Sequence, residues 1–274
     1  MINMIGQTKN KKLIETFKAR NSFPRFIVIT GPEGYGKSVM AQYIAESIEG
    51  YTVYCENSVD SVREVIKNAY NVTKPTVYIF LNAHKMSLQA KNALLKVTEE
   101  PPNKANFILT SISMEQLLST LKSRSTEIKM EPYSVSELKE YRDVPSIKFA
   151  NCPGDIDKLE EVGVENIVKF CEDTLDDCWN ESCYKAMAAT CKIKFGEKDT
   201  EGYDINLVLT VMQSIMYYRI MVYTANSKYF FQILKIITDT MHLINTYNVS
   251  KKAQFDMMLI RIYNLKLSLN KEDK

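Results

Sequence analysis

The segment 31–38, GPEGYGKS, constrains the fold of this 274-residue chain more than any other part of the sequence. It matches the pattern GxxxxGK[ST] of a phosphate-binding loop, which works where a buried strand ends and a helix begins. The sequence supplies that setting, because an apolar run, RFIVIT at 25–30, precedes the loop and a helical pattern follows at 39–48. The chain is therefore expected to build a parallel α/β sheet with this loop after its first strand.

The predicted loop would bind a nucleotide through its main chain and two side chains. Its glycines let N–H groups face phosphate oxygens, and the N-terminus of the following helix adds positive potential. Lys37 is expected to reach the β- and γ-phosphates, and the Ser38 hydroxyl to coordinate Mg²⁺. A turn that is merely rich in glycine would not explain Lys and Ser at its end, so we predict binding of ATP or ADP with Mg²⁺. The predicted nucleotide-binding residues are Gly31, Pro32, Glu33, Gly34, Tyr35, Gly36, Lys37 and Ser38.

Strand and helix patterns alternate up to about residue 132, and helices dominate after it. Strand-like runs at 52–55, 76–81 and 107–111 are separated by helical patterns at 58–70 and 87–99, which implies βαβ units and a parallel sheet. Further helices are expected at 134–141, 155–162, 165–193, 204–223, 227–247 and 250–269. The predicted domains are an α/β nucleotide-binding domain (1–132), a small helical unit (133–165) and a helical bundle (166–274).

Composition points to a protein of the cytoplasm. The formal net charge is only +2, and the six cysteines form no CxxC pair, which favours reduced packing residues over a disulfide framework or a zinc site. The N-terminus lacks the apolar core of a secretion signal. The apolar stretch 207–225 contains Gln213 and Arg219, so a buried helix is favoured there over a membrane span.

The segment 92–103, NALLKVTEEPPN, is similar to the NALLKxLEEPP signature of the clamp-loader subunits of bacterial DNA polymerase III. These are the gamma/tau and delta-prime proteins, related to replication factor C. Further landmarks follow in the family's order: the GQ motif (6–7), the "dxIRe" helix (59–64), the SRC motif (123–125) and the ANGxPG lid motif (150–154). The resemblance covers nearly the whole chain. It implies an AAA+ sheet domain, a helical lid and an all-α collar bundle that holds subunits together.

Several departures from the family's pattern affect hydrolysis. Where active members end their third strand in Asp-Glu, to hold Mg²⁺ and orient water, this chain has Leu81 and Asn82. The arginine expected after the lid motif is replaced by the run 155–157, Asp-Ile-Asp, and the zinc module common in these subunits is absent. The resemblance therefore favours a delta-prime-like subunit, encoded by a chromosome or by a phage, that binds nucleotide with weak or no ATPase activity. A substitute base such as His84 is the alternative.

The resemblance gives two further residues a role at ATP. Arg124, in Ser-Arg-Ser, takes the place of the arginine finger that acts in trans on the ATP of a neighbouring subunit; the alternative is a surface arginine that caps a helix. Ser111, at the end of the fourth strand, takes the sensor-1 place, with Thr110 as second choice.

The expected partners are gamma/tau-like and delta-like clamp-loader subunits, the sliding clamp and the backbone of primer–template DNA, with no membrane. Candidate DNA contacts lie at the start of the helix that carries the signature, although a solvated helix face explains them equally well. These candidates are Lys85, Ser87, Gln89 and Lys91. Two rival functions stay open: an active stand-alone NTPase resembling a helicase loader, and a nucleotide-gated scaffold.

Overall fold

The structure is a computed structural model that describes residues 4–196, 201–223, 227–247 and 249–272. The chain divides into two compact units, unit 1 (Met1–Tyr141) and unit 2 (Arg142–Lys274). Their boundary falls inside the predicted helical unit 133–165, and the division into three domains stays a prediction. The outer ends of the predicted domains, residues 1–3 and 273–274, lie outside the described residues.

Unit 1 is built on a five-stranded parallel sheet with the strand order β2-β3-β4-β1-β5. The parallel α/β fold predicted from the sequence is thereby confirmed. The strands are β1 (Phe26–Thr30), β2 (Tyr51–Cys55), β3 (Thr76–Phe80), β4 (Ala105–Ser111) and β5 (Thr126–Lys129). The helices are α1 (Thr8–Ala19), α2 (Lys37–Ile48), α3 (Val59–Ala69), η1 (Ala83–Lys85), α4 (Leu88–Glu99), η2 (Met114–Gln116), α5 (Ser119–Lys122) and α6 (Val135–Tyr141).

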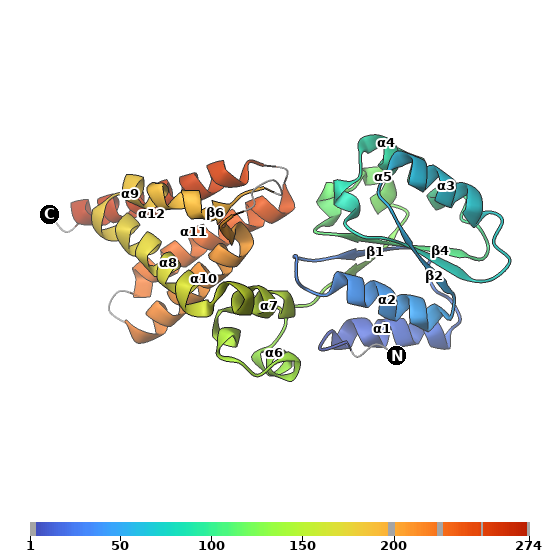
Figure 1. Cartoon of the computed structure of the whole chain (residues 1–274), viewed down its shortest axis with the longest axis horizontal. Helices are drawn as coiled ribbons and strands as arrows, with labels where there is room; N and C mark the ends of the chain where they lie inside the picture. The colour runs from blue at the N-terminus through green and yellow to red at the C-terminus, as the bar shows by residue number, and fades with distance from the viewer. Residues whose placement is uncertain (1–3, 197–200, 224–226, 248, 273–274) are drawn as a thin grey trace. The chain divides into compact units, whose positions relative to one another are not determined.

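Each strand in the middle of the sheet sends alternate side chains into two separate cores, as the two-residue period of a strand requires. In β1, Phe26 and Val28 join one core and Ile27 and Ile29 join the other. The first core packs under α3, α4 and α5, and the second packs against α1 and α2, so helices cover both faces of the sheet (Figure 1). A sheet covered on both faces explains why every residue of β1, β3 and β4 is buried, without the alternation of a half-exposed strand.

The two edges of the sheet differ. The sequence patterns did not indicate β5, a short edge strand in which Ile128 is the buried residue. At the opposite edge β2 was expected, yet its side chains are mostly exposed, including Tyr51 and Tyr54 at 61% and 54%.

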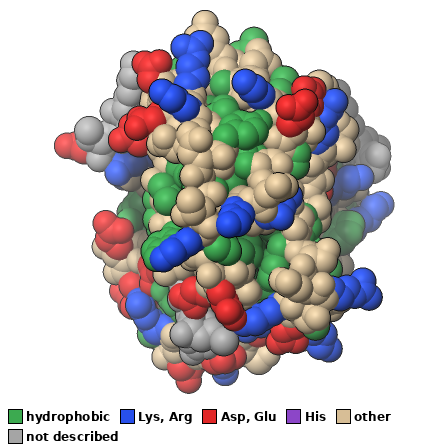
Figure 2. Space-filling view, turned by 90° about the vertical axis from the view of Figure 1, so that its right-hand side faces the viewer, with side chains coloured by type: hydrophobic (Ala, Val, Ile, Leu, Met, Phe, Trp, Pro, Cys, Tyr) green, Lys and Arg blue, Asp and Glu red, His purple; other side chains and the backbone are tan. Residues whose placement is uncertain are grey.

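Figure 2 shows a face of the molecule on which hydrophobic side chains lie among interspersed Lys, Arg, Asp and Glu. Charge of one sign does not dominate that face.

Unit 2 is helical, with a two-residue parallel pair of strands. Its elements are η3 (Pro145–Phe149), α7 (Pro153–Val162), α8 (Val164–Asp176), η4 (Asp177–Glu181), α9 (Cys183–Ala188), η5 (Ala189–Lys192), β6 (Ile193–Lys194), β7 (Tyr203–Asp204), α10 (Ile205–Val222), α11 (Ser227–Thr246) and α12 (Lys251–Glu272). The single helix expected at 165–193 is wrong, because a π-helical turn, η4, interrupts it. Lys185, in α9, pairs with both Asp177 and Glu181 of that turn, at 2.8 and 2.6 Å.

Helix α10 forms the centre of unit 2, in contact with α8 and α11. Asp204 caps it by accepting hydrogen bonds from the main-chain N–H groups of Asn206 and Leu207. Within the described part of the chain, α10 is the helix long and apolar enough to cross a membrane. Half of that 18-residue window is buried inside the protein, as in the core helix of a bundle.

Candidate functional site

The predicted phosphate loop lies between β1 and α2, in the strand–loop–helix setting that the sequence indicated. Gly34 and Gly36 have φ angles of 82° and 80°, and Gly31 has 154°. A Cβ atom on Gly31 would lie 2.8 Å from the Cβ of Met130, so glycine is needed there for close approach as well as for its main-chain angle. The loop therefore has the curled main chain that a phosphate cradle needs.

Lys37 begins α2 and turns back over the loop. Its ammonium group donates hydrogen bonds to the main-chain oxygens of Gly31 and Pro32, at 2.8 and 2.6 Å, and the residue is 8% exposed. These carbonyls hold the ammonium group where a nucleotide's phosphates would compete for it. Ser38, the next residue, is exposed in the first turn of α2. The described residues fit Mg²⁺ in part: Ser38 would supply a hydroxyl ligand, and phosphate oxygens and water the others.

The end of β3 carries no acid. Leu81 packs against the core below α1 and α2, and its carbonyl oxygen accepts a hydrogen bond from the Asn57 side chain at 2.7 Å. Asn82 adopts a left-handed conformation with φ 55°, and its main-chain N–H donates to the Thr110 hydroxyl at 2.8 Å. The place where active relatives hold Mg²⁺ and water is thus filled by a leucine and an amide.

The two sensor-1 candidates are engaged differently. Ser111 is fully buried, and its hydroxyl donates to the carbonyl oxygen of Ser113 at 2.8 Å, while its own carbonyl accepts from Gly31 N at 3.3 Å. Thr110, the second choice, links β4 to the end of β3 through Asn82. Ser111 therefore touches the phosphate loop through its main chain, and a role of its hydroxyl at phosphate stays a prediction.

The four candidate DNA contacts lie around the start of α4. Lys91, a candidate DNA contact, donates to the main-chain oxygens of His84 and Gln116, both at 3.0 Å, and burial lowers the pKa of its ammonium group. Ser87, another candidate, caps α4 by accepting from Ala90 N at 3.2 Å. Both side chains thus have structural partners. The other two candidates, Lys85 and Gln89, are exposed.

The pKa of His84 is strongly shifted by burial and by the charged residues around it. Burial, together with the positive charges of Lys85, Lys37 and Lys91, lowers its pKa to about 4, although Glu33 opposes the shift. Its Nδ1 atom is buried and receives no hydrogen bond from any residue that the structure describes. His84 is therefore neutral at pH 7, and its ring lies within electrostatic range of Lys37 and Glu33 of the phosphate loop.

Lowering the pH is expected to destabilise the protein through His84. An unfolded histidine has a pKa of about 6.5, so between roughly pH 6.5 and 4 the unfolded chain binds a proton that the folded chain does not. The stability is present above that window and is lost as pH falls through it. His84→Gln should reduce this loss, measured as the difference in urea midpoint between pH 7.5 and 4.5. His242→Gln, at an exposed histidine, should retain the wild-type pH dependence, and equal curves for both variants would contradict the assignment.

Arg124 lies at the surface between α5 and β5. Its guanidinium group donates to the carbonyl oxygen of Thr120 at 3.2 Å and pairs with the Glu99 carboxylate at 3.4 Å. The side chain is 39% exposed, and an ion pair in such a setting contributes only about 0–1 kcal/mol. Arg124 thus donates to a carbonyl oxygen of the short helix α5, and its role at a neighbouring subunit's ATP stays a prediction.

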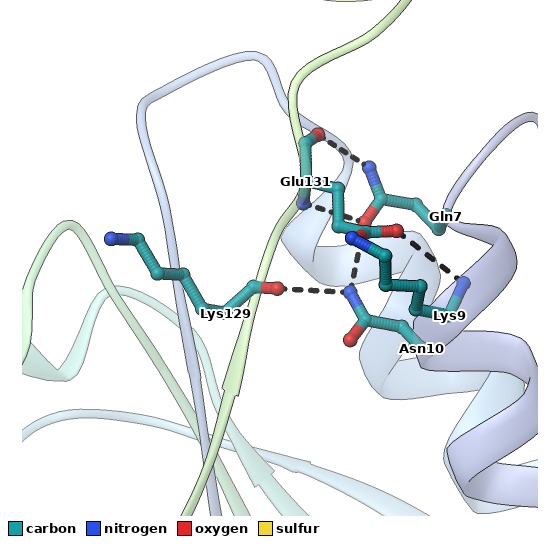
Figure 3. A network of polar contacts seen from close by, with 5 residues as sticks. All are labelled: Gln7, Lys9, Asn10, Lys129 and Glu131. Atoms are coloured by element: carbon teal, nitrogen blue, oxygen red, sulfur yellow. Dashed lines mark hydrogen bonds and ion pairs between the residues drawn. The ribbon is translucent and has the colours of Figure 1, made fainter.

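The GQ motif is a structural clamp. The Gln7 side-chain amide donates to the carbonyl oxygen of Glu131 at 2.8 Å and accepts from Glu131 N at 2.9 Å, in the manner of a neighbouring strand (Figure 3). Asn10 donates to Gln7 and to the carbonyl oxygen of Lys129, at 3.0 and 2.9 Å. Together these side chains satisfy outward-facing main-chain groups at the end of β5.

Sequence reasoning missed the tyrosine that touches the phosphate loop. The hydroxyl of Tyr133 donates to the carbonyl oxygen of Tyr35, from a position 98 residues along the chain. No local signal identified it, because β5, the strand that brings Tyr133 to the loop, has no clear pattern in the sequence. The residues 155–157, which replace the expected lid arginine, belong to unit 2.

Part of the chain is similar in sequence to known proteins. The family described as "DNA polymerase III, delta subunit" matches residues 49–134. The DNA polymerase III subunit gamma of Buchnera aphidicola is 26% identical over 166 residues, covering 49% of this chain and 46% of that protein. The delta-prime subunit from the same organism is 30% identical over 146 residues, covering 50% of this chain and 42% of that protein. The alignments thus span less than half of each relative.

A solved structure gives a weaker likeness. A DNA polymerase III gamma-subunit-related protein from Thermotoga maritima superposes with a TM-score of 0.47 and 17% identity, over 92% of this chain and 99% of that one. The family match carries more weight, because its residues 49–134 include the NALLKxLEEPP-like segment. The chain is similar in sequence to the gamma and delta-prime subunits of bacterial DNA polymerase III, which confirms the resemblance to clamp-loader subunits found in the sequence.

Proposed function

We propose that the chain is a delta-prime-like subunit of a cytoplasmic clamp loader. It binds ATP or ADP with Mg²⁺ and hydrolyses it weakly or not at all. Its Arg124 stabilises the charge that develops on the γ-phosphate of a neighbouring subunit's ATP. Its partners are gamma/tau-like and delta-like subunits, the sliding clamp and primer–template DNA.

The observation that carries this proposal is the pairing of an accessible arginine with a site that lacks its acids. Leu81 and Asn82 offer neither a carboxylate for Mg²⁺ nor a base for water, while the loop around Lys37 keeps a phosphate-binding form. Arg124 would have little hydrolysis to accelerate within its own chain. Its surface position and its weak partner, Glu99, suit an arginine that serves a neighbouring site.

A stand-alone ATPase is the second candidate, and His84 is the residue that favours it. A neutral imidazole whose buried Nδ1 atom has no hydrogen-bond partner among the described residues could hold a water molecule in place of the missing acid. Phosphate release by the purified chain, with and without His84→Gln, separates the two candidates. Rapid turnover that depends on His84 would select the stand-alone enzyme.

Association through unit 2 rests on one group of exposed apolar residues. Of the large residues in α10, Ile215 and Met216 are 3% and 1% exposed and belong to the core. The next turns differ, because large apolar side chains there reach solvent, as does one near the start of α11. The exposed patch consists of Tyr217, Tyr218, Met221, Val222, Tyr223 and Phe231. Large apolar side chains exposed around the end of α10 and the start of α11 suit a site of protein association.

Tyr218→Glu combined with Met221→Glu is expected to remove the chain from its complex. The two side chains are 67% and 79% exposed, so the substitutions should leave the fold intact while placing charge in an apolar interface. Purification of the tagged full-length chain from its native host, with mass spectrometry, should recover the clamp and gamma/tau-like subunits for wild type only. Tyr184→Glu, at an 81% exposed residue in α9, is the matched control. Full recovery with the double variant would show that this patch does not hold the complex together.

A further inference from the structure

Tyr133 ties the phosphate loop to a different part of unit 1. It lies between β5 and α6, and its hydroxyl donates to the main-chain oxygen of Tyr35, in the middle of the loop, at 3.0 Å. The two aromatic rings also pack edge to face, with centroids 5.8 Å apart and planes at 64°. The loop is thus held at its middle by a hydrogen bond and a ring contact from a segment distant in sequence.

The loop segment held in this way has high conformational freedom of its own. Tyr35 is flanked by Gly34 and Gly36, both with φ angles near 80°. Glycine has more accessible conformations than any other residue, so ordering two of them has a large entropic cost. Lys37 ties the beginning of the loop through the carbonyls of Gly31 and Pro32. The contact from Tyr133 to Tyr35 restrains the rest of the loop, which lies between Pro32 and the start of α2.

Tyr133 is itself fixed in place. A Cβ atom on Gly6 would lie 3.2 Å from Cδ1 of Tyr133 and 2.9 Å from Oε1 of Glu137, so the N-terminal segment packs closely on both residues. Glu137 closes a capping box at the start of α6 by accepting from the main-chain N–H of Ser134 at 2.7 Å, which lowers the pKa of its carboxyl group. The ring of Tyr133 therefore packs against the N-terminal segment at Gly6, which also lies close to the Glu137 carboxylate.

We propose that Tyr133 is a positioning residue that holds the phosphate loop in its ligand-ready form before the ligand arrives. This inference rests on the proposed nucleotide binding. Its ligand class is the polyphosphate group, whether free or carried by a nucleoside, because the atoms it orders belong to the phosphate cradle. A loop that is competent in only a fraction of molecules binds more weakly by that fraction. Loss of the Tyr133 hydroxyl should therefore slow association more than it speeds release.

Tyr133→Phe tests the proposal, because it keeps the ring and its packing and removes only the hydroxyl. The affinities for Mg-ADP and for inorganic tripolyphosphate should fall by the same factor, about 3- to 10-fold for one main-chain hydrogen bond. Stopped-flow binding of a fluorescent ADP analogue should show this factor in the association rate, with the dissociation rate nearly unchanged. Tyr70→Phe is the matched control, since Tyr70 donates the same kind of bond to Glu100 O at 2.9 Å, between the C-terminal ends of α3 and α4. It should bind both ligands as wild type does.

Each other outcome overturns the inference in a recognisable way. If Tyr133→Phe binds both ligands with wild-type rates, the tether has no role although nucleotide binding stands. A loss for ADP without a loss for tripolyphosphate would mean that Tyr133 contacts the nucleoside instead. An equal loss in Tyr70→Phe would reveal a general loosening of unit 1. A wild-type chain that binds neither ligand overturns the proposed nucleotide binding as well.

Discussion

Replacing Arg124 with alanine is expected to lower ATP turnover at the adjoining site of a reconstituted clamp loader by about 10³–10⁵-fold, the range for loss of an arginine finger. The guanidinium group reaches the surface at 39% exposure, and its present partners, Thr120 O and Glu99, bind it weakly enough to release it. The chain's own affinity for nucleotide should change little. Single-turnover clamp loading is the appropriate readout, because other sites in the complex would sustain the total ATPase rate.

Two further variants distinguish a finger from a cap. Arg124→Lys should restore little activity, since an ammonium group lacks the planar fork that matches two phosphoryl oxygens. Lys122 lies in the adjacent helix α5 and pairs with Glu115 at 2.8 Å. The control variant Lys122→Ala should load clamps normally. Sedimentation must show that each complex is assembled. Normal loading by an assembled Arg124→Ala complex would leave Arg124 as a surface residue that caps α5.

Replacing Lys37 with alanine is expected to weaken binding of Mg-ATP and Mg-ADP by about 10²–10⁴-fold. This range corresponds to the loss of two charge-assisted bonds to phosphate at about 1.5–3 kcal/mol each. The residue is buried, and its ammonium group already bonds to the carbonyls of Gly31 and Pro32. The variant therefore also frees the loop, so Lys37→Met, which keeps most of the side-chain volume, should accompany it.

Calorimetry measures the binding, and phosphate release by the wild-type chain measures hydrolysis. Lys18→Ala, which removes a surface ion pair with Glu49 in the same unit, is the control and should bind nucleotide normally. Retention of full affinity by Lys37→Ala would exclude the loop as the phosphate site. Rapid Mg²⁺-dependent hydrolysis by the purified wild-type chain would contradict the weak ATPase inferred from Leu81 and Asn82.

The phosphate loop and the inner strands could be predicted because each has a strong local cause. The strands β1, β3 and β4 are buried along their whole length, since the sheet is covered on both faces, and the helices α3 and α4 begin at the serine caps Ser58 and Ser87. The strand β5 has no such signal. Its sequence, Thr-Glu-Ile-Lys, places one residue in the core, and its position depends on pairing with β1 from nearly 100 residues away.

Other features depend on contacts that no local pattern encodes. The helical period continues through 165–193, yet the structure inserts a π turn where Lys185 meets two acids. Lys91 reads as a surface lysine, but two carbonyls from separate segments hold its ammonium group. In the candidate site the sequence could therefore identify the residues of the loop. It could not identify Tyr133 or the low pKa of His84, which depend on tertiary packing.

The unequal edges of the sheet bear on how the isolated chain would behave at high concentration. At the end of β5, side-chain amides occupy the main-chain groups with which another strand would pair. The strand β2 has no charged residue and no proline, and it exposes Tyr51, Val53 and Tyr54. Natural sheets commonly guard such an edge against fibril-like stacking. Aggregation of the purified protein would thus begin by strand pairing at β2, and high protein concentration would favour it. The edge at β5 would pair less readily.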